Sequence, residues 1–332
     1  MKNKISIDLG SAFTKIYKSN ADIVLYEPTA IAIENNNYKK PIAYGYEALK
    51  LLGKTSNNVK VIYPVNSVEI IDEKALKCLL LEYINRVKEP FEFKPDILFS
   101  VTLGANRESI KNFEKIFNDI GYYNIEYAEL PILSLIGSNA SLEDGTTSLI
   151  FDLGASQTTI CALTLSGVIS GVSIEYGLNK LNSLIMANVE EVLGISISES
   201  QAENLKIEVG GLEQEDETKT IIVGKDVLTG KPKSCPITCS NIYSACKTYA
   251  DKIIEVANLI ISNLNEDVIL DVKKRSIILV GGGSLIYGIK KYLENALPFK
   301  VTIPPESELS SAIGAGRVIE DKALLNKIKL IV

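Results

Sequence analysis

Short apolar runs alternate with stretches of helical periodicity along most of the chain. Between Lys74 and Val87, apolar residues recur every three or four positions, which predicts an amphipathic helix. The run 96–102 is almost continuously apolar, as a strand buried on both faces should be. Residues 108–120 return to the helical period, and Gly121 follows as a stop signal. This alternation predicts an α/β fold with mixed sheets.

The same two patterns place the other elements. Short runs rich in β-branched and aromatic residues predict strands over 4–9, 15–17, 22–25, 29–34, 125–128, 148–153, 158–164, 220–223, 233–238 and 276–280. Helical periodicity predicts helices over 131–137, 180–193, 200–209, 241–263 and 284–296. The polar stretch 139–147, with Asp144 and Gly145, is the natural hinge between two halves.

One segment of the chain occurs twice. Residues 8–14 are Asp-Leu-Gly-Ser-Ala-Phe-Thr, and residues 152–158 are Asp-Leu-Gly-Ala-Ser-Gln-Thr. Each copy follows an apolar strand and precedes another strand. A single Asp-x-Gly turn is common, but two copies on matching strands predict two similar domains that face one cleft.

Composition narrows the possible functions. The 332 residues are 46% hydrophobic and 23% charged, which suits one large or two medium globular α/β domains. A net charge of −6 argues against a general nucleic-acid binder. The N-terminus lacks the apolar core of a signal peptide, and glycines interrupt the uncharged stretch 153–174. We therefore expect a cytoplasmic protein that meets a membrane, if at all, from its surface.

The chain contains no histidine, which excludes imidazole chemistry, including serine and cysteine triads. The five cysteines are scattered and odd in number, so we expect reduced thiols. Cys235 and Cys239 are spaced like half of a metal site but lack a second pair, and a turn before a helix is the simpler interpretation. Any catalysis must use carboxylates, lysine, hydroxyls, backbone amides or a bound cation.

The repeated turns carry groups suited to phosphate. Gly10 and Gly154 let the backbone turn tightly and approach a ligand, and successive N–H groups in such turns form an anion-binding nest. Lys15 adds positive charge for a β- or γ-phosphate. Asp8 and Asp152 lie at strand ends, where a carboxylate can hold a hydrated Mg²⁺. The hydroxyl donors are Ser11, Thr14, Ser156 and Thr158.

Three consecutive glycines, Gly281, Gly282 and Gly283, follow a predicted strand and precede a predicted helix. Glycines there permit close contact with a base or a phosphate, and a helix N-terminus favours an anion. A glycine run is as often a tight strand-to-helix turn with no ligand. Both interpretations stay open on the sequence alone.

The two turns and the glycine run, in this order, resemble the superfamily of actins, heat-shock chaperones and sugar kinases. Other stretches resemble the MreB family of bacterial actins, and the resemblance covers essentially the whole chain. It implies an α/β, actin-like fold of two duplicated ribonuclease H-like domains, divided into four subdomains around a nucleotide cleft. The stretches are 23–33, 53–55 with Pro64, 131–138, 206–210, 229–232 and 281–288.

The resemblance also implies subdomain boundaries. Subdomain IA takes residues 1–32, 62–140 and 312–332, IB takes 33–61, IIA takes 141–177 and 241–311, and IIB takes 178–240.

The resemblance further implies a cytoskeletal function. Members of the family join head to tail into protofilaments on the inner face of the membrane, and with cell-shape membrane proteins they organise cell-wall synthesis. Rival interpretations are a non-polymerising nucleotide-binding regulator with the actin fold, a small-molecule kinase and a heat-shock-type ATPase. A kinase would need a further catalytic Asp near the cleft, and we find no clear candidate.

By position, the resemblance assigns roles to the candidate residues. The ligand would be ATP or ADP with Mg²⁺, the metal being held by Asp8 and Asp152. Lys15 matches actin better than MreB, which usually has an apolar residue there. The implied nucleotide contacts are Gly10, Ser11, Ala12 and Lys15 on one side, Gly154, Ala155 and Ser156 on the other, Gly281, Gly282 and Gly283 near adenine and the α-phosphate, and Glu203 and Lys206 near ribose and adenine.

Two features depart from the MreB pattern. MreB has Glu-Glu-Pro where this chain has Glu129-Leu130-Pro131, and the second Glu positions the attacking water. The second turn also lacks two glycines and a Glu of that pattern. Since leucine cannot hydrogen-bond a water, we expect slow or lost hydrolysis with nucleotide binding retained. Glu129 or Gln157 could substitute, Thr158 is the remaining catalytic candidate, and a one-residue shift of the alignment is the alternative.

Phe91 and Phe93 lie in a short loop between a helix and a strand. The matching loop in MreB dips into the membrane, and two aromatic residues beside lysines suit that interface. Inward packing of both rings is the equally reasonable alternative.

Overall fold

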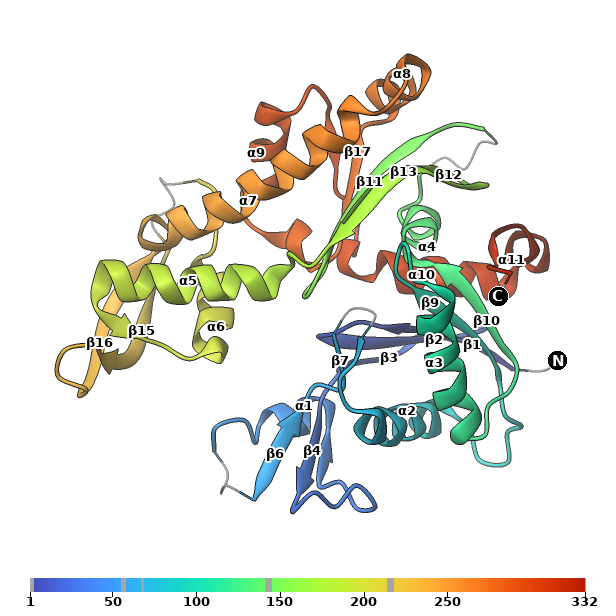
Figure 1. Cartoon of the computed structure of the whole chain (residues 1–332), viewed down its shortest axis with the longest axis horizontal. Coiled ribbons are helices and arrows are strands. Elements are labelled where there is room, and N and C mark those ends of the chain that lie inside the picture. The colour runs from blue at the N-terminus through green and yellow to red at the C-terminus, as the bar shows by residue number, and fades with distance from the viewer. Residues whose placement is uncertain (1–2, 55–57, 67–68, 141–144, 214–217, 332) are drawn as a thin grey trace. The chain divides into compact units, whose positions relative to one another are not determined.

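The computed structural model describes residues 3–54, 58–66, 69–140, 145–213 and 218–331, and part of the predicted hinge, 141–144, lies outside them. Within these ranges, no helix combines the length and hydropathy needed to cross a membrane. The chain divides into two compact units (Figure 1). Unit 1 comprises Met1–Thr146, Leu163–Ile169 and Leu309–Val332, and unit 2 comprises Thr147–Ala162 and Ser170–Glu308.

Unit 1 is built on a five-stranded sheet in the order β10-β9-β1-β2-β3. β1 is parallel to β9, and β9 to β10, whereas β2 is antiparallel to both β1 and β3. The strands are β1 (Lys4–Leu9), β2 (Phe13–Lys18), β3 (Asp22–Pro28), β9 (Asp96–Val101) and β10 (Ile125–Glu129).

The faces of this sheet have different partners. The apolar stripes of α2 (Glu73–Val87) and α3 (Arg107–Asp119) join Ile5 and Ile7 of β1 in one buried core. Successive side chains of a strand point to opposite faces, so Asp8 lies on the face that α10 (Ser310–Glu320) packs against. α11 (Lys322–Ile328) follows α10.

α10 crosses α4 (Leu130–Gly137) at backbone contact. A Cβ atom on Gly137 would lie 1.7 Å from the carbonyl oxygen of Ser310, and one on Gly314 would lie 1.8 Å from that of Leu133. Arg317 of α10 also donates a hydrogen bond to a carbonyl near the end of α4. No side chain fits at the two glycine positions, so glycine is required at both.

Unit 2, taken with the hairpin end Leu163–Ile169 that the division counts in unit 1, repeats the sheet of unit 1. From the hairpin edge the order is β13-β12-β11-β17-β18, which matches β3-β2-β1-β9-β10 position by position. β11 is parallel to β17, as β1 is to β9. The prediction of two duplicated domains is therefore confirmed. The strands are β11 (Ser148–Leu153), β12 (Thr158–Thr164), β13 (Gly167–Ile174), β17 (Ile277–Val280) and β18 (Val301–Thr302).

The remaining elements cover these sheets or form small sheets of their own. Two three-stranded sheets, β5-β4-β6 and β14-β15-β16, fall close to the ranges predicted for subdomains IB and IIB, whose boundaries stay predictions. The helices of unit 2 are α5 (Leu178–Leu193), α6 (Glu199–Val209), α7 (Cys239–Ser262), α8 (Glu266–Arg275) and α9 (Ile289–Ala296), with the 3₁₀ turns η1 (Gly282–Leu285) and η2 (Ser307–Leu309). The others are β4 (Ile31–Glu34), β5 (Ala43–Tyr44), α1 (Gly45–Leu49), β6 (Val59–Ile62), β7 (Val65–Asn66), β8 (Glu69–Ile70), β14 (Ile195–Ser196), β15 (Lys219–Asp226) and β16 (Pro232–Thr238).

One predicted helix is wrong in its first half. The stretch 284–296 was expected to be one helix after the glycines, but the glycines lead into the short turn η1. Gly288 then adopts a left-handed conformation with φ 77°, and α9 begins only at Ile289. The glycine run is therefore not followed directly by an α-helix N-terminus, and the anion-binding argument that relied on one does not hold.

Candidate functional site

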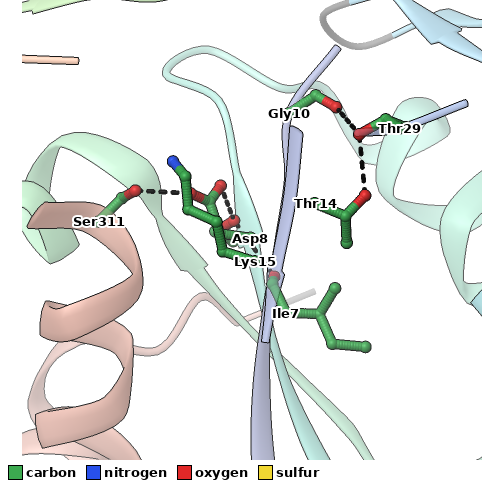
Figure 2. A network of polar contacts seen from close by, with 8 residues as sticks. Ile7, Asp8, Gly10, Thr14, Lys15, Thr29 and Ser311 are labelled. Carbon is green, nitrogen blue, oxygen red and sulfur yellow. Dashed lines mark hydrogen bonds and ion pairs between the residues drawn. The ribbon is translucent and has the colours of Figure 1, made fainter. Parts of the chain in front are cut away.

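The carboxylate of Asp8 is the centre of a buried polar network in unit 1 (Figure 2). Its Oδ2 accepts hydrogen bonds from Lys15 Nζ at 3.1 Å and from Ser311 Oγ at 2.6 Å. Its Oδ1 accepts a bond from Ser100 Oγ at 3.1 Å. Asp8 is only 4% exposed, so these donors replace the water that the carboxylate loses on folding.

The surroundings of Asp8 keep it ionised. Burial by itself would raise the pKa of the carboxyl group, but the charge of Lys15 and the donors Ser311, Lys15 and Ser100 outweigh it and lower the pKa below 3.8. Asp8 and Lys15 thus form a buried ion pair whose remaining hydrogen-bonding capacity is largely satisfied, the condition under which such a pair is stable.

The donors around Asp8 do not fit a metal ion at this carboxylate. Mg²⁺ is held by free lone pairs of oxygen ligands, whereas both oxygens of Asp8 already accept hydrogen bonds from an ammonium and two hydroxyls. A cation about 4 Å from the Lys15 ammonium would be repelled by roughly 4 kcal/mol per unit charge. Among the described residues, no cluster of three or more acidic or cysteine side chains could hold a metal either. The expected metal role of Asp8 therefore conflicts with the structure.

The first repeated turn, after β1, is fixed by Thr29. The N–H of Gly10 donates to the carbonyl of Phe13 at 2.9 Å, which closes the turn. Thr29 donates its backbone N–H to the carbonyl of Ala12 (2.8 Å) and its hydroxyl to that of Gly10 (2.7 Å), and the Thr14 hydroxyl bonds that of Thr29 (Figure 2). The carbonyl oxygens of Gly10 and Ala12 thus bond to Thr29, and the turn has one rigid conformation.

The second turn, after β11, closes in the same way. The N–H of Gly154 donates to the carbonyl of Gln157 at 2.9 Å, the counterpart of the Gly10–Phe13 bond. Here the first turn of α5 takes the place of Thr29: the N–H groups of Leu178 and Asn179 donate to the carbonyls of Gly154 (3.0 Å) and Ala155 (2.8 Å). The two copies of the motif therefore share backbone geometry as well as sequence.

Thr158 is fully buried, and its hydroxyl donates to the carbonyl of Tyr176 at 2.7 Å. This bond joins β12 to the segment that leads into α5 through Gly177. A Cβ atom on Gly177 would lie 2.4 Å from the carbonyl oxygen of Ala155, so the segment packs directly on the turn. The hydroxyl of Thr158 thus holds the turn in place, and a catalytic role for it remains an untested prediction.

The three glycines pack against the end of β11. A Cβ atom on Gly281 would lie 2.5 Å from Asp152 Oδ1, and one on Gly283 would lie 2.4 Å from the Cβ of Leu153. Gly281 also has a φ of 79°, which favours glycine. Only Gly282 is exposed, so it is the glycine of this run that is open to a ligand.

Glu203 and Lys206 form an ion pair on α6. Lys206 Nζ donates to Glu203 Oε2 at 2.6 Å, and Asn182 Nδ2 of α5 donates to the same oxygen at 2.8 Å. Lys206 is buried, whereas the Glu203 side chain is 43% exposed. The predicted pair is therefore brought together, with one carboxylate edge open to solvent.

Glu129 is the last residue of β10, and Leu130 is the first residue of α4. Burial raises the pKa of the Glu129 carboxyl group. A carboxylate with a raised pKa is a better proton acceptor than an exposed one. Glu129 is thus the side chain at this strand-to-helix junction that can act on a water, while Leu130 offers no polar atom.

The aromatic loop after α2 does not bury its rings. Phe91 is fully exposed and Phe93 is 87% exposed, so the alternative in which both rings pack inward is wrong. Between them, Glu92 turns inward and pairs with Lys18 of β2 at 3.1 Å, each side chain being 12% exposed. This ion pair fixes the middle of the loop and leaves its two aromatic neighbours in solvent.

Four functional positions escaped the sequence analysis. Ser100, Ser311, Thr29 and Gly177 hold the two turns and the buried carboxylate, yet none lies within the repeated motif. A serine or threonine gives no periodic signal, so only the fold brings these residues to the site.

The fold of the whole chain is that of the bacterial actins. It is similar to MreB5 of Spiroplasma citri bound to AMPPNP, with a TM-score of 0.91, 24% identity and 98% of each chain covered. It is also similar to a subunit of the MamK double helical filament, with a TM-score of 0.82, 18% identity and coverage of 97% of this chain and 99% of that one. The chain therefore has an actin-like fold, as expected.

The sequence defines the family. The sequence model for the MreB/Mbl protein family matches residues 2–327. The chain is 26% identical over 324 residues to the cell shape-determining protein MreB of Escherichia coli (strain K12), covering 96% of this chain and 93% of that one. It is 27% identical over 319 residues to the cell shape-determining protein Mbl of Bacillus cereus, covering 96% of each. The chain belongs to the MreB/Mbl family.

Removing one donor from Asp8 should destabilise unit 1 in a pH-dependent way. We expect Ser311→Ala to lower the free energy of unfolding at neutral pH by about 2 kcal/mol, the value of a hydrogen bond to a charged group. The folded pKa of Asp8 lies below its ordinary value of 3.8, so this stabilisation is present above that pH and is lost as pH falls through the folded pKa. Urea unfolding at neutral pH and at about pH 3 measures the difference.

The neighbouring Ser310→Ala is the matched control. Ser310 is also buried on α10, and its hydroxyl has no hydrogen-bond partner among the described residues. Because this hydroxyl is buried without a partner, its removal should not lower the unfolding free energy at either pH. Equal losses for the two serines would contradict the role given to Ser311.

Proposed function

We propose that this protein is a bacterial actin of the cell-shape class, which binds ATP or ADP and assembles head to tail into filaments. The observation that carries the proposal is the matched construction of the two turns, closed by Gly10–Phe13 and Gly154–Gln157, in a chain of the MreB/Mbl family. Such turns present backbone N–H groups to an anion, and the phosphates of a nucleotide are such an anion.

Related structures support both parts of the proposal. MreB5 of Spiroplasma citri has been solved with AMPPNP and with ADP, and MamK as a double helical filament. The named relatives that span the chain are cell shape-determining proteins. A small-molecule kinase, a non-polymerising regulator and a heat-shock-type ATPase are less favoured, because the family model that spans the chain is that of the MreB/Mbl proteins.

The nucleotide contacts follow from the expected roles and the geometry of each unit. In unit 1 we propose phosphate contacts at Gly10, Ser11 and Ala12, and in unit 2, taken by itself, at Ala155 and Ser156. The exposed edges of the Gly282 turn and of the Glu203–Lys206 pair are the proposed contacts for the adenosine moiety. A magnesium ion that arrived with the nucleotide would have to be held by its phosphates and Asp152, since the donors around Asp8 do not fit it.

Filament assembly is the direct test. We expect the pure protein to pellet at high speed with ATP or with the slowly hydrolysed analogue AMPPNP, and to stay in the supernatant without nucleotide. Negative-stain images of the pellet should contain paired protofilaments. A protein that binds labelled ADP but never pellets, with or without vesicles, would refute the filament proposal and favour the regulator or the kinase.

We also propose that hydrolysis is slow, because Leu130 stands where the resemblance implies a water-positioning Glu. The raised pKa of Glu129 makes it the nearest substitute base, but it lies one residue earlier, at the end of a strand. Adding a carboxylate at position 130 should supply the missing group.

Leu130→Glu should raise the single-turnover rate of phosphate release by about a hundredfold, the lower end of what a positioned general base contributes. Leu130→Met is the control, because it changes the shape of the side chain without adding an acceptor. If the unaltered protein already releases phosphate at an ordinary ATPase rate, the proposal of slow hydrolysis is wrong.

We propose that the aromatic loop binds the inner face of the cell membrane, where cell-shape membrane proteins would be its neighbours. Phe91 and Phe93 project from a loop whose middle residue is held by Lys18. Exposed rings next to lysines are the composition of an interfacial anchor.

Replacing both rings, in Phe91→Ser with Phe93→Ser, should weaken binding to anionic liposomes in a flotation assay by about a hundredfold or more, since roughly 3–5 kcal/mol of apolar burial is removed from each subunit. Ile221→Ser is the control for general surface polarity, because Ile221 is also exposed but lies on β15 of unit 2. Unchanged flotation of the double variant would contradict the membrane proposal.

A further inference from the structure

Lys15 forms an ion pair with Asp8, the residue whose carboxylate is expected to hold a metal ion. The two residues are direct partners across β1 and β2, and Lys15 Nζ lies 3.1 Å from Asp8 Oδ2. The lysine side chain is 15% exposed and the aspartate side chain 5%. Buried ion pairs are stable only when further hydrogen bonds complete them, and Ser100 and Ser311 provide those bonds to Asp8.

This ammonium is attached rigidly to the phosphate turn. Lys15 follows Thr14, whose hydroxyl is bonded to Thr29, and Thr29 in turn bonds the carbonyls of the turn. Figure 2 shows Lys15 of β2 beside Asp8 of β1, with Ser311 of α10 reaching the same carboxylate. A fixed positive charge therefore lies on the strand that leaves the turn, where a bound cation would otherwise balance Asp8.

The second turn has no such charge. The residue that corresponds to Lys15 in the repeat is Thr159, whose hydroxyl bonds that of Ser173 at 2.6 Å. The duplication is therefore asymmetric in charge: one aspartate has its own ammonium, and the matching position in the other copy is neutral.

We propose that Lys15 takes the place of the metal at Asp8, so that this protein binds the terminal phosphates of its nucleotide with a tethered ammonium and depends little on a divalent cation. The inference rests on the nucleotide binding proposed above. The inference explains why the donors around Asp8 do not fit a metal ion. The positive charge that balances the Asp8 carboxylate is already supplied by the Lys15 ammonium.

The test compares the dissociation constant of fluorescently labelled ADP in Mg²⁺ and in EDTA. For the unaltered protein we expect EDTA to weaken binding by less than about tenfold, because the ammonium remains. For Lys15→Met we expect the loss in EDTA to exceed that of the unaltered protein by about tenfold or more, the value of one charge-assisted contact. Lys15→Arg, which keeps the charge, should retain most of the metal tolerance.

Lys18→Met is the matched control, because Lys18 lies on the same strand and forms an equally buried ion pair, with Glu92. It should leave the ratio of the two constants unchanged. If Lys15→Met does not fold, the pair Asp8→Asn with Lys15→Met removes the lone buried charge and should show the same gain in metal dependence.

Two results overturn the inference: abolition of ADP binding to the unaltered protein by EDTA, or equal ratios for that protein and Lys15→Met. Failure to bind ADP in Mg²⁺ as well would refute the proposed function itself and this inference with it.

Discussion

A carboxylate that is 4% exposed stays charged only if the protein surrounds it with donors, and the architecture of unit 1 supplies them to Asp8. The donors come from β2, β9 and α10, so they lie 7, 92 and 303 residues away along the chain. The carboxylate is complete only when the sheet has formed and the C-terminal segment has returned to it. The position of the Asp8 carboxylate thus depends on the fold of the whole unit. The turn that follows β1 is held in place beside it.

Duplication gave the two units the same sheet and the same turn but different ways of holding the turn. In unit 1 a single residue, Thr29, bonds the two carbonyls through its hydroxyl and its backbone N–H, and in unit 2 backbone N–H groups at the start of α5 do so. The first N–H groups of α5 in unit 2 are thereby bonded to the protein's own carbonyl oxygens. Electrostatic attraction for phosphate must therefore come from the turns and from fixed charges, and Lys15 is such a charge in unit 1.

The heptapeptide motif was enough to predict both turns and the aspartate before each of them, because a local motif specifies local geometry. Its repetition predicted the duplicated fold. The periodic signal also located most strands and helices within a few residues. It failed at 284–296, where Leu285 and Ile286 continue an apolar pattern although Gly288 breaks the helix with φ 77°. It could not find Ser311 or Ser100, since a single hydroxyl has no pattern and its partner is set by tertiary structure.

The crossing of α4 and α10 sets a limit on how this chain can vary. Where residues pack through their side chains, a larger side chain at one position can be offset by a smaller one at a neighbouring position. At Gly137 and Gly314 the backbones themselves touch, so there is no side-chain volume to exchange. No substitution elsewhere can make room for even a methyl group without separating the helices. No second substitution can therefore compensate for the replacement of either glycine, and both positions must stay glycine.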